Sequence, residues 1–90
     1  MTQIAIDKQA DPEAAELAQG MLIAEAEDGA YEPVCLVSTI REARELAAEN
    51  FRIRMDELES GGEPMCPARY MVWARVNYGA YKTVAEIDAV

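Results

Sequence analysis

Apolar residues recur at helical spacing between residues 39 and 60, and this is the clearest hydrophobic pattern in the chain. One face of the predicted helix carries Ile40, Ala43, Ala47, Phe51 and Leu58. Thr39 and Glu42 have the spacing of a capping box, which satisfies backbone N–H groups at a helix N-terminus. Gly61 and Gly62 follow as a stop signal, because glycine adopts the left-handed conformation at a helix end without a Cβ penalty. The pattern predicts a long helix over residues 39–60.

Runs of β-branched and aromatic residues predict three strands elsewhere. Residues 31–37 form one of them, and Pro33 places it at a sheet edge or a bulge because proline has no N–H to donate. Residues 68–76 and 80–87 predict a hairpin rich in tyrosine, tryptophan, valine and isoleucine. The Asn-Tyr-Gly sequence at 77–79 suits a three-residue loop with Gly79 in the left-handed conformation.

The loop length sets the register of this hairpin. A three-residue loop pairs Val76 with Ala80, Ala74 with Lys82 and Val72 with Val84. Four large apolar side chains then share the opposite face of the sheet: Met71, Trp73, Tyr81 and Ile87. A two-residue loop would change these partners.

Two interpretations compete for residues 12–27. Asp11, Pro12 and Glu13 are typical of a helix start, and apolar residues follow at helical spacing as far as Leu22. Gly20 opposes a helix, because glycine in a helix interior costs about 1 kcal/mol relative to alanine. We favour the helix because residues 21–26 contain a single β-branched residue.

The alternative rests on an internal similarity. Residues 21–34 (MLIAEAEDGAYEPV) align with residues 71–84 (MVWARVNYGAYKTV) at an offset of 50, with six identities in fourteen positions. Three of the identities are alanine or methionine in an alanine-rich chain, so chance is a competing explanation. If the match is structural, residues 21–26 and 30–37 form a hairpin like the C-terminal one.

We therefore expect a single α+β domain over residues 1–90, with residues 1–10 prone to fraying. Its predicted parts are a small antiparallel sheet (strand 31–37 plus hairpin 68–76/80–87), one long helix 39–60 packed on that sheet, and an N-terminal helix 12–27. The alternative is the order β-β-α-β-β with two similar hairpins.

Composition and charge narrow the class of protein. A hydrophobic content of 51% fits a packed globule, and the net charge is −9. Residues 1–32 hold eight acids against one lysine, giving −7. Nucleic-acid binding is not expected, because an acidic chain has no general attraction for phosphates. The longest apolar run, residues 21–24, is too short to span a bilayer, and no basic segment precedes an apolar stretch. We expect a cytoplasmic protein without membrane contact.

No set of residues specifies a chemistry. The chain has no histidine, so a Ser-His-Asp or Cys-His arrangement is impossible within it. Cys35 and Cys66 are too few for a structural zinc site, and we expect both thiols to be reduced. Glu42, Glu45 and Glu49 recur along one helix, but no second carboxylate helix with a histidine motif accompanies them. We expect no catalytic residue, no metal and no cofactor.

The expected function is a non-catalytic protein–protein interaction module that forms a homodimer. Its candidate interface consists of Met71, Trp73, Tyr81 and Ile87. An alternative is an acidic decoy or antitoxin-like inhibitor, in which residues 1–32 neutralise a basic or nucleic-acid-binding partner. A third hypothesis, with weaker support, is an acid–base enzyme whose cleft is lined by Glu42, Glu45 or Tyr78.

Overall fold

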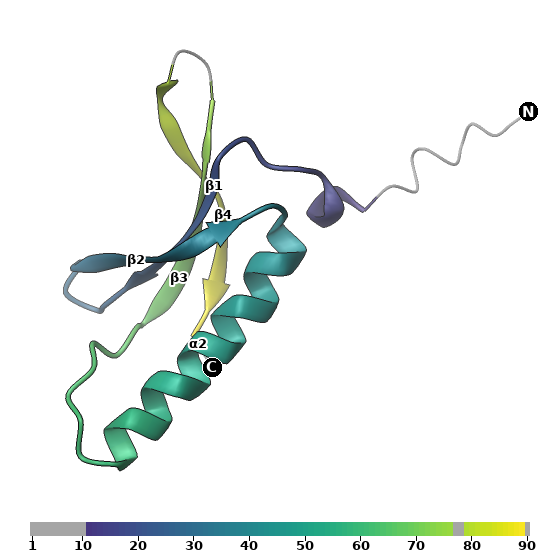
Figure 1. Cartoon of the computed structure of the whole chain (residues 1–90). Coiled ribbons are helices and arrows are strands. Elements are labelled where there is room, and N and C mark those ends of the chain that lie inside the picture. Colours follow the sequence, from purple (N-terminus) through teal and green to yellow (C-terminus); the bar gives the residue numbers. More distant parts are fainter. Residues whose placement is uncertain (1–10, 77–78, 90) are drawn as a thin grey trace, which may run out of the picture.

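Among the residues that the structure describes, four antiparallel strands form one twisted sheet, and a long helix packs against one of its faces (Figure 1). The computed structural model describes residues 11–76 and 79–89. The elements in chain order are η1 (Pro12–Ala14), β1 (Gly20–Glu25), β2 (Tyr31–Val37), α2 (Ile40–Glu59), β3 (Arg69–Arg75) and β4 (Tyr81–Asp88). The strand order in the sheet is β2-β1-β3-β4. The predicted fraying of residues 1–10 lies outside the described residues.

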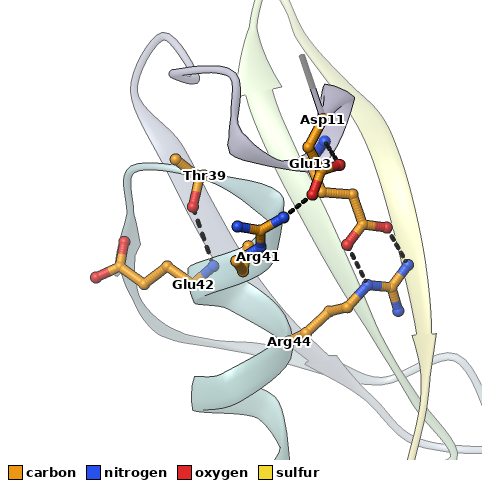
Figure 2. Close-up of polar contacts among 6 residues, drawn as sticks. All are labelled: Asp11, Glu13, Thr39, Arg41, Glu42 and Arg44. Carbon is orange, nitrogen blue, oxygen red and sulfur yellow. Dashed lines mark hydrogen bonds and ion pairs between the residues drawn. The ribbon is translucent and has the colours of Figure 1, made fainter. Parts of the chain in front are cut away.

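The predicted central helix is confirmed as α2. The Thr39 hydroxyl accepts a hydrogen bond from the Glu42 N–H at 3.0 Å (Figure 2), and the Glu42 carboxylate accepts the Ser38 N–H at 2.6 Å. Both bonds satisfy backbone donors at the start of the helix, and the arrangement differs from a standard capping box in that Glu42 accepts the N–H of Ser38, the residue before the N-cap. At the other end Gly61 has φ +95°, the left-handed conformation that ends a helix.

The core lies between α2 and the sheet. The helix contributes two buried alanines, Ala43 and Ala47, whose small side chains let it approach the strands closely. The buried cluster consists of Leu22, Ala24, Val37, Ala43, Ala47, Tyr70 and Val72. Phe51 and Leu46 pack against its margin. A single helix therefore covers a single face of the sheet.

The predicted N-terminal helix over 12–27 is wrong. Its start signal is real, because the Asp11 carboxylate accepts the Glu13 N–H at 2.9 Å, but only the single 3-10 turn of η1 follows. The chain then enters β1 at Gly20. A Cβ on Gly20 would lie 2.5 Å from the carbonyl oxygen of Val37 on the neighbouring strand. Gly20, which counted against the predicted helix, is therefore required because two strands approach each other closely at this position.

β1 lies in the centre of the sheet, between β2 and β3. Leu22, Ile23 and Ala24 are fully buried although successive side chains of a strand point to opposite faces. A strand buried on both faces loses the apolar–polar alternation by which strands are recognised in sequences. This is why residues 21–24 could be mistaken for part of a helix.

The two hairpins are built alike, which confirms the β-β-α-β-β alternative. In the first, the Ala26 N–H donates to the Ala30 carbonyl at 2.7 Å, and in the second, the Val76 N–H donates to the Ala80 carbonyl at 2.7 Å. These residues correspond at the offset of 50. Both bonds close three-residue loops, as the sequence predicted for the second hairpin, although residues 77–78 lie outside the described residues.

Further details repeat at the same offset. Gly29 has φ +92° and Gly79 has φ +87°, so each loop ends on a left-handed glycine. The strand registers show that Val34 is an extra, bulged residue in β2 and that Val84 is the equivalent bulge in β4. The internal sequence similarity therefore reflects a structural repeat.

The repeat has an approximate two-fold axis. β1 and β3 pair antiparallel, and Leu22 lies opposite Val72, which is its own equivalent at the offset of 50. Met21 lies opposite Trp73 and Ile23 lies opposite Met71, so the pairing is unchanged when the two hairpins are exchanged. The axis passes through the sheet between the two central strands. It places the C-terminal ends of β1 and β3 at opposite ends of the sheet (Figure 1).

The bulge in β4 corrects the predicted register. The predicted partner of Ala74 is confirmed as Lys82, but Val72 lies opposite Ala85 and not Val84. Every residue after the bulge is shifted by one position. Ile87 therefore pairs with Tyr70 on the helix-covered face and packs against the core.

A polar network fixes the second half of α2 to the sheet. The fully buried Tyr70 donates its hydroxyl hydrogen to the Asn50 side-chain oxygen at 2.7 Å, and burial raises the pKa of this hydroxyl. Arg54 donates to the same oxygen at 2.7 Å and to the Met65 carbonyl at 3.0 Å, and forms an ion pair with Glu32 at 2.6 Å. Asn50, a weak helix former, is present because its amide oxygen accepts these bonds.

The segment before β1 is attached to the start of α2 by ion pairs. Glu13 forms two hydrogen bonds of 2.8 Å with Arg44, and Asp11 forms an ion pair with Arg41 (Figure 2). The bidentate contact with Arg44 lowers the pKa of the Glu13 carboxyl.

Within the residues that the structure describes, no helix combines the length and the apolar character that a membrane span needs.

Candidate functional site

The face of the sheet opposite α2 is the candidate site. Side-chain alternation and the strand registers place one set of apolar residues there. We call this surface the open face and define it by its apolar residues Met21, Ile23, Tyr31, Leu36, Met71, Trp73 and Tyr81. Among the described residues no helix packs on it.

The centre of the open face is packed. Ile23 is fully buried and Met71 is 9% exposed, although neither belongs to the core under α2. The rings of Tyr31 and Trp73 meet edge to face, with centroids 5.4 Å apart and an interplanar angle of 63°. Tyr31 comes from β2 and Trp73 from β3, so their contact spans β1 between them. The aromatic pair therefore fixes the two rings across the centre of the open face.

Large apolar side chains around this centre are accessible to solvent. Leu36 is 73% exposed, Tyr31 58% and Tyr81 49%. Scattered exposed hydrophobic residues are ordinary, but these three lie on one face beside a packed aromatic centre. A contiguous apolar surface of this kind is typical of a protein-binding site.

Tyr81 separates two hollows at one end of the open face. One hollow, of about 470 Å³, lies towards β1, β2 and the start of α2, and its lining includes Met21 and Leu36. The other, of about 210 Å³, is lined by Trp73, Tyr81, Lys82 and Thr83. Tyr81 therefore borders both recesses, and recesses of this kind can receive side chains of a partner.

A strained glutamine orders this end of the face. Gln19 has φ +51°, which is uncommon for a residue other than glycine. Its side-chain oxygen accepts hydrogen bonds from Arg75 at 3.0 Å and from the Tyr81 hydroxyl at 3.2 Å. The Arg75 N–H also donates to the Ala18 carbonyl at 2.8 Å. The segment before β1 thus fixes the position of Tyr81 on the second hairpin.

The opposite end of the open face is charged. Arg69 pairs with Glu25 on one neighbouring strand at 2.5 Å and with Glu86 on the other at 3.0 Å. These contacts raise the pKa of Arg69, with the hydrogen bond to Glu25 as the largest cause. Asp88 lies opposite Arg69 in the register, and Glu27 and Asp28 form the adjacent turn. Acids outnumber bases at this end.

The structure brings three of the four predicted interface residues together. Met71, Trp73 and Tyr81 lie on the open face, and Ile87 lies on the covered face for the reason given above. The prediction missed the first hairpin's contribution, which consists of Met21, Ile23, Tyr31 and Leu36. The internal repeat was the signal that could have found them, because Tyr31 corresponds to Tyr81 and Ile23 to Trp73.

The residues considered for catalysis are dispersed. The Glu42 carboxylate is engaged by the Ser38 N–H, and Glu49 forms an ion pair with Arg52 at 2.7 Å on the exposed side of α2. Glu45 is exposed on the same helix, and Tyr78 lies outside the described residues. Over residues 11–76 and 79–89, no group of three or more histidine, cysteine, aspartate or glutamate residues is placed to hold a metal ion.

The two cysteines are free and differ in environment. Cys35 is half-buried, packs against the core and has a raised pKa, first because of burial and second because of the nearby Glu42 carboxylate. Cys66 is exposed.

Comparison with known proteins yields no match to a family, to a curated protein or to a solved structure.

Proposed function

We propose that the chain is a non-catalytic interaction module that self-associates as a homodimer through the open face. The observation that carries the proposal is the exposure of Leu36, Tyr31 and Tyr81 around a packed aromatic centre on one uncovered sheet face. A two-fold dimer covers the same patch on both chains and is the commonest closed arrangement of soluble proteins.

The edges of the sheet favour association through the face. β2 is one edge, and it carries Pro33, which has no N–H to donate, next to the bulge at Val34. β4 is the other edge, and it carries Lys82 and the bulge at Val84. Proline, lysine and bulges are the features by which natural sheets discourage strand-to-strand addition. The apolar face is the surface left for a partner.

The acidic-decoy alternative has less support. It requires the carboxylates of residues 1–32 to be available to a basic partner. Among the described residues, Asp11, Glu13, Glu25 and Glu32 each form an ion pair with an arginine of the same chain. A basic partner would have to compete with these contacts.

Fluorescence can test the proposal because Trp73 is the single tryptophan and lies on the open face. We expect the emission of Trp73 to shift to longer wavelength on dilution, as the dimer separates and water reaches the indole. Leu36→Ser should move this transition to a higher protein concentration. Leu58→Ser is the matched control, because Leu58 is 46% exposed on α2, away from the open face.

Trp73→Ala should weaken the dimer by roughly 2 kcal/mol or more, as central aromatic anchors do. This variant needs sedimentation as its readout, since it removes the fluorophore. Equal behaviour of Leu36→Ser and Leu58→Ser would place the interface elsewhere, and emission that does not depend on concentration would argue against self-association through this face.

A further inference from the structure

The open face carries an apolar projection at one edge of the sheet and a recess at the other. Leu36, on the edge strand β2, is 73% exposed, the highest exposed fraction among the large apolar residues that the structure describes. The hollow of about 210 Å³ lies beside β4, the other edge strand, and is lined by Trp73, Tyr81, Lys82 and Thr83. The register places three of these four side chains, all but that of Lys82, on the open face.

The projection and the recess lie in the same row of the sheet. A row here means the residues that the strand register sets opposite one another, one from each strand. Met21 lies opposite Leu36 on one side and opposite Trp73 on the other. Trp73 in turn lies opposite Thr83 on β4. This apolar row therefore runs from Leu36 at one edge to Thr83, beside the recess, at the other.

A second row of the same face, four residues further along β1, is charged. Glu25 lies opposite Arg69 and forms an ion pair with it at 2.5 Å. Asp88 lies opposite Arg69 on β4. The two central residues of this charged row, Glu25 and Arg69, lie on either side of the midline between β1 and β3.

We infer that two copies of the chain meet on their open faces about a two-fold axis that runs along the strands, so that Leu36 of each chain enters the recess beside Thr83 of the other. This inference rests on the proposed self-association. Rotation about an axis over the midline between β1 and β3 places each row over the same row of the second copy and exchanges the two edges of the sheet. Each projection then meets a recess, and a two-fold interface contains this contact twice.

The charged row favours the same axis. Rotation about an axis along the strands sets Glu25 of one chain over Arg69 of the other, so that opposite charges face each other across the interface. A two-fold axis across the strands, through the centre of the face, would lay the apolar row of one chain over the charged row of the other. Removing the charges from water against apolar side chains is unfavourable.

A double-mutant cycle tests the contact between Leu36 and Thr83. Within one chain these residues are separated by two strands, or roughly 14 Å at the usual strand spacing, so substitutions at the two positions should act independently unless the residues meet across the dimer. Leu36→Ala removes the projection and Thr83→Leu fills the recess. Leu58→Ala is the matched control for Leu36→Ala, because Leu58 is also exposed and lies on α2, away from the open face.

The measurement is the dimer dissociation constant of the full chain, by sedimentation velocity. We expect Leu36→Ala and Thr83→Leu each to raise this constant by roughly tenfold, since the first empties the contact and the second blocks it. The double variant should lie within about threefold of either single variant, because Leu36 is the group that the filled recess excludes. Independent effects would multiply to roughly a hundredfold. Leu58→Ala should leave the constant within about twofold.

The possible failures are distinguishable. A natural chain that stays monomeric removes the proposed function and this inference together, and so does a dimer that is unaffected by Leu36→Ala. A dimer that is weakened by Leu36→Ala, but in which Thr83→Leu acts independently whatever the sign of its effect, keeps the proposed function and rejects the axis along the strands.

Discussion

The Asn50–Tyr70 contact allows a quantitative test of how α2 is held to the sheet. Asn50→Ala removes the acceptor of a fully buried hydroxyl and of one Arg54 N–H. An unsatisfied buried hydroxyl costs about 1–3 kcal/mol, and alanine returns about 0.6 kcal/mol through its better helix propensity. Arg54 keeps its contacts with Glu32 and Met65, so the loss of its hydrogen bond to Asn50 adds little to the destabilisation. We expect a net decrease of about 1.5 kcal/mol in the free energy of unfolding.

Urea denaturation followed by circular dichroism would measure this decrease; the protein concentration is held fixed because the proposed self-association would make the apparent stability depend on it. Asn50→Asp is the control, since it retains an acceptor for both donors and should cost less than 1 kcal/mol. Tyr70→Phe removes the hydroxyl that donates to Asn50. In the Tyr70→Phe background, Asn50→Ala should therefore lower the free energy of unfolding by about 1 kcal/mol less than it does in the natural chain. Strictly additive effects, or a decrease below about 0.5 kcal/mol for Asn50→Ala, would refute the network.

Three further predictions concern other parts of the chain. Gly20→Ala should lower the free energy of unfolding by about 2–3 kcal/mol, because its Cβ would meet the Val37 carbonyl, and an unchanged urea midpoint would contradict this. In the native protein Cys66 should react with iodoacetamide before Cys35, whose burial raises its pKa; mass spectrometry of partly labelled protein would identify the first site. The lowered pKa of Glu13 means that its ion pair adds stability above the usual value of about 4.5 and loses it as the pH falls. Glu13→Gln should therefore lower the melting temperature more at pH 7 than at pH 3, and equal shifts at both would exclude this linkage.

The parts of the fold that the sequence predicted correctly are those with local signals. The helix follows from the Thr39 cap, the apolar stripe and Gly61, and all of these act within a few residues of the chain. The left-handed conformation of Gly79 follows in the same way from the residue itself. The predicted edge position of β2 follows from Pro33, because a missing N–H is a property of the residue itself.

The errors arise where distant contacts decide the structure. Gly20 is required by the Val37 carbonyl on another strand, and Leu22, Ile23 and Ala24 are buried by contacts with elements that are distant in the sequence. The bulge at Val84 moves Ile87 to the covered face, and nothing in the local sequence distinguishes a bulged valine from a paired one. The internal repeat links the two bulges, because Val34 and Val84 are equivalent positions. A bulge known at Val34 in the first hairpin would therefore predict the bulge at Val84 in the second.

Sedimentation equilibrium of the natural chain tests the proposed function most directly. Self-association through the open face predicts a molar mass that rises with concentration towards twice the 9.9 kDa of one chain, with a dimer predominating at high micromolar concentration. Leu36→Ser should shift that rise to higher concentration. A mass that stays at 9.9 kDa across the same range would contradict the proposal that this face binds a second copy of the chain.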